Sequence, residues 1–379
     1  MNKKIWLGVA VIVLVAVLVV VFLTTRQQEA DTITVGAILP LTGDSAQWGI
    51  PPRNGAELAV EEINARGGVA GKRLILSVED SRAVPKEGVS AFNKIISGGN
   101  VRIILGAVAS SVSLAVAPIA ERNHVVLISP ASTNPKITDA GDFIFRVIPS
   151  DVLRGQVFAE YLFKDKGIRE VAFIYINNEG GVGNRDSFKA RFTELGGKVI
   201  LEEGYNQGTS DLRSQITKVK ASEAEAVVVV SYPQDTILLM KQAKELDIGK
   251  PLFFQTEAVE DANVLREAGN AAEGVTYILP APAEGAASDR FANAYKQKYG
   301  KNPELFAAEA YDIIYLIAKA IESNPDSKPS AELVRDYLYN VRNHAGASGS
   351  ITFDKHGDVV KPMAIKRIVN GQPALVKVR

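Results

Sequence analysis

The sequence predicts an α/β protein built of two doubly wound lobes with parallel sheets, preceded by an N-terminal transmembrane helix. Three observations predict this arrangement. After residue 31, short apolar runs rich in β-branched residues alternate with helical stretches, in two blocks of similar rhythm at 32–149 and 150–280. Strands that are apolar throughout need helices on both faces of their sheet. A length of 379 residues also suits two domains of about 150 residues each. Finally, residues 5–23 form an unbroken apolar run.

The N-terminal run predicts an uncleaved signal anchor. Lys3 and Lys4 precede 19 apolar residues, which span about 28 Å as a helix and so match the hydrocarbon thickness of a bilayer. A secretory signal usually has a shorter apolar region, about 7–15 residues, and a small-x-small cleavage site. Here the following TTRQQEAD contains Ala30 as its single small residue. A cleaved signal peptide is the alternative. In both cases the two lysines stay inside and the remaining chain faces outward.

The first block begins with a strand at 33–39 and a helix at about 52–65, which Gly67 and Gly68 end. Further strands are expected at 74–78, 101–105 and 125–129, and further helices at 86–97 and 111–122. Pro118 lies inside the last of these helices. Because a proline in a helix interior costs about 3 kcal/mol, the sequence predicts a kink or a break there.

The second block continues the same alternation. Strands are expected at 171–176, 227–231 and 252–255, and helices at 152–164, 184–195, 210–221 and 234–246. The C-terminal part then carries helical stretches at 286–299, 304–324 and 330–342, followed by short strands near 350–353 and 362–369.

Composition and motifs argue against several function classes. The 43 basic and 43 acidic residues balance, so no electrostatic footprint for nucleic acid is present. The absence of cysteine excludes disulfides, cysteine-ligated metals and thiol catalysis. The sequence contains no phosphate loop, dinucleotide fingerprint or GxSxG elbow, and His124, His344 and His356 lack metal-ligand spacing. FDKHGD at 353–358 indicates a hairpin turn rather than a calcium loop. We therefore expect no catalytic residue, metal or cofactor, and a binding protein rather than an enzyme.

Two segments at predicted strand ends carry groups that bind small charged ligands. Ser110 and Ser111 follow a strand and open a helix, where free N–H groups and the helix dipole favour an anion. In the SPAST segment, Thr133 offers a hydroxyl and an N–H, and the Ala131 carbonyl can accept from an ammonium. Ligands of parallel sheets bind at such carboxyl ends. The plainer interpretations are a serine that caps its own helix and an ordinary polar turn.

Three further residues complete a candidate site. Glu257 follows the strand at 252–255, the place for a carboxylate that pairs with a cation, although a solvated loop acid is the alternative. Trp48 occupies a loop after the first strand of the first block, and Tyr232 follows the strand at 227–231 of the second block, and large aromatics on such loops are typical of binding sites. Together the residues suit a small zwitterion with an apolar tail.

An ordered set of segments resembles one known family. The segments are VGAILPLTGDSAQWG, NARGGVAGKRL, LSVEDSRAVP, ILGAVASS, VAPIAERNHVVLISPAST, SYPQD, FQTE and FDKHGD, and together they span nearly all of 32–379. They resemble the substrate-binding proteins of branched-chain amino-acid ABC transporters, which have the type I periplasmic binding fold. The resemblance implies two lobes joined by three hinge strands, at 31–149 with 281–348 and at 150–280 with 349–379, after an anchor and linker at 1–30.

The resemblance also implies a role for each site residue. Ser110 and Thr133 would hold a ligand carboxylate, and Thr133, the Ala131 carbonyl and Glu257 would hold its ammonium. Trp48 and Tyr232 would flank its side chain. The chain departs from the pattern in GGVG at 180–183, where Val182 stands at a position that several relatives fill with tyrosine, so a roomier or more apolar pocket is expected. Arg82 and Ala109 stand roughly where some relatives have a disulfide.

The expected function is that of an extracytoplasmic, monomeric binding protein at the cell membrane. It would capture an amino acid, branched-chain or similarly apolar, by closing its lobes, and would deliver it to the membrane subunits of an ABC permease. A sensor of the same fold for an amide, urea or organic acid is the alternative, and a hydrolase comes third. No nucleic-acid partner is expected.

Overall fold

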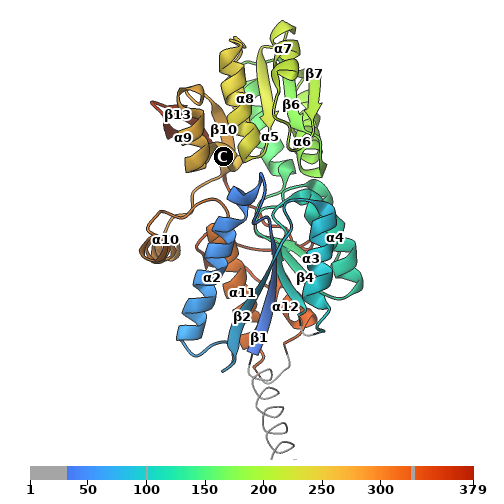
Figure 1. Cartoon of the computed structure of the whole chain (residues 1–379), viewed down its shortest axis with the longest axis vertical. Coiled ribbons are helices and arrows are strands. Elements are labelled where there is room, and N and C mark those ends of the chain that lie inside the picture. The colour runs from blue at the N-terminus through green and yellow to red at the C-terminus, as the bar shows by residue number, and fades with distance from the viewer. Residues whose placement is uncertain (1–31, 100, 326–328) are drawn as a thin grey trace, which may run out of the picture.

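The computed structural model describes residues 32–99, 101–325 and 329–379, so the predicted anchor at 1–30 lies outside the described residues. Two lobes are stacked along the long axis of the molecule (Figure 1). Among the described helices, none combines the length and the apolar character that crossing a membrane requires.

The first lobe is built on a parallel sheet of five strands in the order β2-β1-β3-β4-β5. The strands are β1 (Thr32–Leu39), β2 (Arg73–Asp80), β3 (Ile103–Gly106), β4 (Val126–Ser129) and β5 (Ile144–Arg146). The helices between them are α2 (Ile50–Ala65), α3 (Pro85–Ile96) and α4 (Ser110–Arg122), with short 3-10 turns at Ala46–Trp48 and Pro135–Ile137.

Helices from the C-terminal part of the chain complete this lobe. They are α10 (Ala286–Tyr299), α11 (Ala307–Glu322) and α12 (Ala331–Tyr339), followed by the hairpin strands β11 (His344–Gly346) and β12 (Gly349–Ile351). α11 packs along α2 (Figure 1), and the hydroxyls of Tyr311 and Tyr315 on α11 both donate to Glu62 on α2, at 2.6 and 2.7 Å. Segments distant in sequence therefore form one layer over the first sheet.

The second lobe is built on a seven-stranded sheet in the order β14-β13-β10-β9-β8-β6-β7. Its strands are β6 (Glu170–Ile176), β7 (Lys198–Tyr205), β8 (Ala226–Val230), β9 (Leu252–Phe254), β10 (Thr276–Pro280), β13 (Met363–Val369) and β14 (Gln372–Val378). Its helices are α5 (Asp151–Glu160), α6 (Glu179–Glu194), α7 (Arg213–Ala221), α8 (Pro233–Glu245) and α9 (Ala262–Ala268). A π-helical turn at Tyr161–Asp165 and 3-10 turns at Glu257–Glu260 and Gly269–Ala271 are inserted among them.

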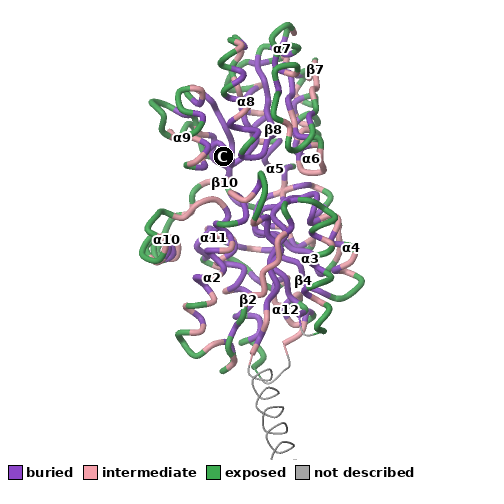
Figure 2. Tube along the Cα trace, viewed as in Figure 1, coloured by how far each residue is buried: buried purple, intermediate pink, exposed green. Residues whose placement is uncertain are grey.

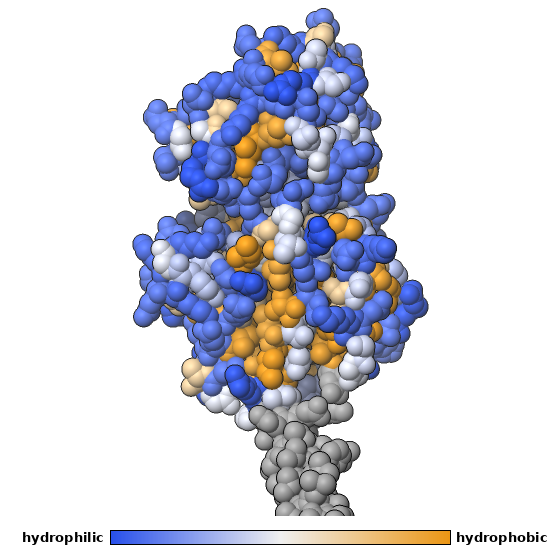
Figure 3. Space-filling view, in the orientation of Figure 1, coloured by the Kyte–Doolittle hydropathy of each residue, from blue (hydrophilic) through white to orange (hydrophobic). Residues whose placement is uncertain are grey.

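Burial follows the position of each strand in its sheet. β8 lies in the middle of the second sheet and is buried along its whole length, whereas β7 at the edge is only partly buried (Figure 2). In the view of Figure 3, hydrophilic residues dominate the surface and apolar residues gather in a band over the region of β1 and β2. Edge strand β2 contributes Ile75 to the exposed apolar residues.

The chain passes between the two sheets three times within the described residues: after β5, after β10, and between β12 and β13. These segments stand where the resemblance implies hinge strands, but they are connections rather than regular strands. Two of them are joined by a hydrogen bond of 2.8 Å from the Ala281 N–H to the Pro362 carbonyl.

Several elements differ from the sequence prediction. β13 and β14 are antiparallel to their neighbours, and β5, β7, β10 and β14 were not predicted as strands. The helix predicted at 184–195 begins earlier, at Glu179, so the GGVG segment forms the start of α6. The predicted break at Pro118 is absent: α4 runs continuously from Ser110 to Arg122 through this proline. Its inner face, including Val112, Val116 and Ala120, is fully buried, and that burial offsets the hydrogen bond lost at the proline.

Candidate ligand-binding site

A small cavity of about 50 Å³ lies between the two lobes at the carboxyl ends of strands from both sheets. Six of the seven predicted site residues line it, and Ser111 does not. The lining residues are Trp48, Val108, Ala109, Ser110, Ala131, Thr133, Arg154, Gly180, Gly181, Asn184, Val230, Ser231, Tyr232, Gln255, Thr256, Glu257 and Phe306. The structure therefore brings together loops that are far apart in sequence, as the strand-end argument predicts.

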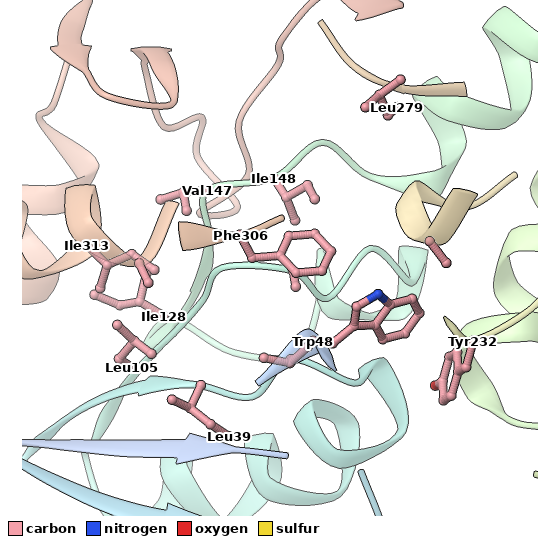
Figure 4. Packing of buried hydrophobic residues seen from close by; sticks show 14 of the residues in the cluster. Leu39, Trp48, Leu105, Ile128, Val147, Ile148, Tyr232, Leu279, Phe306 and Ile313 are labelled. Atoms are coloured by element: carbon pink, nitrogen blue, oxygen red, sulfur yellow. The ribbon is translucent and has the colours of Figure 1, made fainter. Parts of the chain in front are cut away.

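Aromatic rings from both lobes meet at one side of this cavity. The ring of Trp48 lies 4.6 Å from that of Tyr232 in an edge-on arrangement, and 6.2 Å from that of Phe306 (Figure 4). The hydroxyl of Tyr232 accepts a hydrogen bond of 3.1 Å from the Asn178 side chain. Burial raises the pKa of Tyr232 to about 12, so this hydroxyl stays neutral. The Trp48–Tyr232 contact joins the two lobes at this side of the cavity.

Ser110 is the first residue of α4, and its hydroxyl has partners outside that helix. No side chain caps α4, whose N-cap is Ala109, so Ser110 is not the cap of its own helix. Instead, its hydroxyl oxygen accepts from the N–H groups of Thr133 and Asn134, at 3.2 and 3.3 Å. The hydroxyl hydrogen of Ser110 thus stays available for a ligand.

The carboxylate of Glu257 forms a buried ion pair with Arg154. The guanidinium of Arg154 on α5 binds both oxygens of Glu257, with Nη1 at 3.1 Å from Oε2 and Nη2 in contact with Oε1. Arg154 is 2% exposed and Glu257 is 6% exposed. Burial by itself lowers the pKa of Arg154. The carboxylates of Glu257 and Asp151 outweigh this effect and raise the pKa above its ordinary value, so the guanidinium stays charged. A ligand ammonium at Glu257 would share that carboxylate with Arg154.

Asp151 lies directly behind the cavity wall and orients three residues of the site. Its carboxylate accepts from the Thr133 hydroxyl at 2.9 Å and from the Asn184 side chain at 3.1 Å, and it lies 3.6 Å from Nε of Arg154. Burial raises the pKa of the fully enclosed Asp151 carboxyl to about 6. The hydroxyl of Thr133, predicted to bind the ligand, is therefore already donated to Asp151.

Several buried polar atoms of this cavity wall have no hydrogen-bond partner among the described residues. They are Nε1 of Trp48, Nε of Arg154, Oδ1 of Asn184, and both side-chain amide atoms of Gln255. Buried polar groups in proteins are nearly always hydrogen-bonded, so these atoms mark a place where an additional molecule supplies the partners.

The GGVG segment approaches the other lobe closely. Val182 does not line the cavity, but Gly180 and Gly181 do. A Cβ added to Gly181 would lie 1.9 Å from the Ile176 carbonyl oxygen, and one added to Gly183 would lie 2.4 Å from the side-chain nitrogen of Asn134 in the first lobe. Gly183 thus allows the start of α6 to pack against the first lobe.

A larger cavity of about 590 Å³ lies on the other side of Glu257 and Phe306. Among the predicted site residues, Glu257 is the one that it shares with the cavity between the lobes. Its wall comes mainly from the segments around α10, the start of α11 and the turn at Glu257–Glu260. Size alone does not make it the site, because the strand-end loops of both sheets converge on the smaller cavity.

Sequence reasoning missed Arg154, Asn184, Gln255 and Phe306. Gln255 could have been found, since it directly follows β9 in the same FQTE segment as Glu257. Arg154 and Asn184 are single polar residues on helices, where a solvent-facing position is the ordinary expectation. Only the tertiary structure shows that both residues line the cavity, where their side chains donate to the Gln255 carbonyl.

Comparison with known proteins agrees with this architecture. Residues 32–373 match the model of the periplasmic binding protein family. The chain belongs to this family. Its fold is accordingly the type I periplasmic binding fold.

The relatives of this family member include transport proteins. It is 30% identical over 350 residues to the leucine-, isoleucine-, valine-, threonine- and alanine-binding protein of Pseudomonas aeruginosa, covering 91% of this chain and 92% of that protein. The solved structure of a leucine-binding protein from Thermotoga maritima superposes with a TM-score of 0.85 at 30% identity, covering 91% and 98% of the two chains. The solved structure of a branched-chain amino-acid transporter substrate-binding protein of Streptococcus pneumoniae, in complex with isoleucine, superposes with a TM-score of 0.81 at 25% identity. The match covers 91% of this chain and 99% of that chain.

Proposed function

We propose that this protein is the extracytoplasmic substrate-binding component of an ABC importer, and that it captures an amino acid between its lobes for delivery to the permease. The observation that carries the proposal is the cavity formed by strand-end loops of both sheets and closed by the contact of Trp48 with Tyr232. The relatives bind leucine, isoleucine, valine, threonine and alanine by name, which makes a compact side chain the expectation. The protein acts as a monomer without catalytic activity.

Capture proceeds by opening and closing of the lobes. A cavity of about 50 Å³ is far below the range of about 300–1,000 Å³ that is usual for ligand pockets, so a ligand needs the lobes to open before it enters. The three connections between the sheets are the places where backbone angles change in such a motion. Closure then removes the ligand from water and seats it between α4 and the segment that follows β9.

A thermal-shift screen tests the proposal. The full chain in mild detergent is melted with each of a panel of amino acids, amides and organic acids. At a hundredfold excess over its dissociation constant, a true ligand stabilises the folded state by about 2.7 kcal/mol, which raises the unfolding temperature saturably. We expect amino acids to give the largest shifts. Shifts confined to amides or organic acids would replace the amino acid by those ligands, and no shift at all would contradict the binding function.

We also propose that residues 1–30 anchor the protein to the membrane, with 31–149 and 281–348 forming one lobe and 150–280 and 349–379 the other. The support for the anchor is the apolar run at 5–23 behind two lysines. Sequencing the N-terminus of the mature protein from its native membrane is expected to return a start at or next to Met1. A start near Asp31 would mean that the segment is a cleaved signal peptide.

A further inference from the structure

Gln255 directly follows β9 and is 1% exposed. Its backbone is well anchored: its N–H donates to the Val229 carbonyl at 2.8 Å, and its carbonyl accepts from Asn184 at 3.2 Å and from Arg154 at 3.3 Å. Its side-chain amide, in contrast, has no partner for either Oε1 or Nε2 among the described residues. Burying an amide in this way destabilises the folded chain unless another molecule pairs with it.

Two neighbours in the same cavity wall add matching groups. Asn184 donates its side-chain N–H groups to Asp151 and to the Gln255 carbonyl, which leaves its Oδ1 as an acceptor without a partner in the described structure. The indole N–H of Trp48 is a donor that also lacks a hydrogen-bond partner in the described structure. These three neutral side chains thus present both acceptors and donors, and Nε of the charged Arg154 is a further donor without a hydrogen-bond partner in the same wall.

The charges of Arg154 and Glu257 do not change the need for both a donor and an acceptor on the ligand. Arg154 and Glu257 bind each other through both carboxylate oxygens, so their charges are largely compensated. If the ligand side chain faces Gln255 and Asn184, an aliphatic side chain leaves the amide of Gln255 and the Oδ1 of Asn184 unpaired. A carboxylate could accept from Gln255 and Trp48 but could not donate to Asn184. A primary amide, with two N–H donors and a carbonyl acceptor, satisfies both kinds of group.

We propose that this site selects an amino acid whose side chain ends in a short neutral amide, with asparagine as the best match, and that Gln255 determines this specificity. The inference rests on the proposed capture of an amino acid and changes only the expected chemistry of its side chain. Asparagine agrees better than the longer glutamine with the compact side chain expected from the relatives. A site built to hydrogen-bond a polar group rejects an isostere that lacks it, because its own buried groups are then left unpaired.

Asparagine and leucine provide a sharp test, since their side chains have the same number and branching of heavy atoms and differ in hydrogen bonding. Calorimetry on the full chain in mild detergent is expected to give at least tenfold tighter binding of asparagine than of leucine. Gln255→Met keeps the side-chain length and removes both polar atoms. It is expected to weaken asparagine binding at least tenfold and to leave leucine binding within about threefold, with an unfolding temperature equal to or above that of the wild type.

Gln242→Met is the matched control. Gln242 is also buried, but its Oε1 accepts from the Leu212 N–H at 2.7 Å and it does not line the cavity. This variant should leave the ratio of the two affinities unchanged. Leucine binding to the wild type as tightly as asparagine would overturn the inference while amino-acid capture stands. Equal weakening of both ligands by Gln255→Met would also overturn it, because Gln255 would then contact the groups that they share. Binding of neither amino acid would remove the proposed function itself.

Discussion

Glu257→Gln is expected to weaken amino-acid binding at least tenfold and also to destabilise the folded chain. If the ligand ammonium shares the carboxylate of Glu257, losing that charged partner costs roughly 2–5 kcal/mol of binding free energy. The same substitution removes the carboxylate that binds the buried guanidinium of Arg154 through both oxygens and leaves Asp151 as its neighbouring carboxylate, which costs about 3–5 kcal/mol of unfolding free energy. From the sequence alone, Glu257 would be a free carboxylate whose replacement left the fold intact. The ion pair with Arg154 changes that expectation.

A double variant separates the two effects. Combining Glu257→Gln with Arg154→Gln removes both charges of the pair, so it should recover much of the lost stability without restoring affinity. Affinity is measured by calorimetry and stability by denaturant unfolding. Glu260→Gln serves as the control, because Glu260 belongs to the same short turn but pairs with Lys366 and lies outside the interlobe cavity. If Glu257→Gln lowers stability and leaves affinity unchanged, Glu257 is only the counter-ion of Arg154.

Trp48→Ala is expected to weaken ligand binding by about 2–4 kcal/mol, the loss typical of an aromatic hot spot. The indole contacts Tyr232 across the lobe interface and lies close to Phe306, so its removal opens one side of the closed cavity. Trp48→Phe keeps an aromatic face in place and should cost less. It removes the unpartnered indole N–H as well, so its effect measures that donor together with the smaller ring.

The fluorescence of Trp48 gives an independent measurement. The chain contains two tryptophans, so Trp6→Phe leaves Trp48 as the sole indole. Trp48 is 8% exposed in the closed arrangement, and opening of the lobes would expose it to water. Ligand addition is therefore expected to change its emission saturably. A spectrum that stays flat, with Trp48→Ala lowering thermal stability but not affinity, would show that Trp48 only packs the lobe interface.

Much of the fold was predictable because it depends on local patterns. Apolar β-branched runs such as 227–231 have to be buried on both faces, and the structure places the corresponding strand β8 in the middle of its sheet. The short strand β5 and the edge strand β7 were missed. β5 has only three residues, and β7 is only partly buried, so neither shows the continuous apolar pattern. The reversed direction of β13 was not predictable, since it depends on the return of the chain from the first lobe.

The sequence by itself determined the two-lobed α/β architecture and the strand-end positions of Trp48, Ser110, Ala131, Thr133, Tyr232 and Glu257, all of which line one cavity. These results follow from hydrophobic periodicity and from the common edge at which parallel strands end. Only the tertiary structure decided which groups pair with each other there. Arg154 forms an ion pair with Glu257, and Asp151 accepts a hydrogen bond from the hydroxyl of Thr133. The side-chain amide of Gln255 has no hydrogen-bond partner among the described residues. Hydrogen bonds and ion pairs act over about 3 Å, and the packing of α5 and α6 within the second lobe and against the first lobe sets such distances.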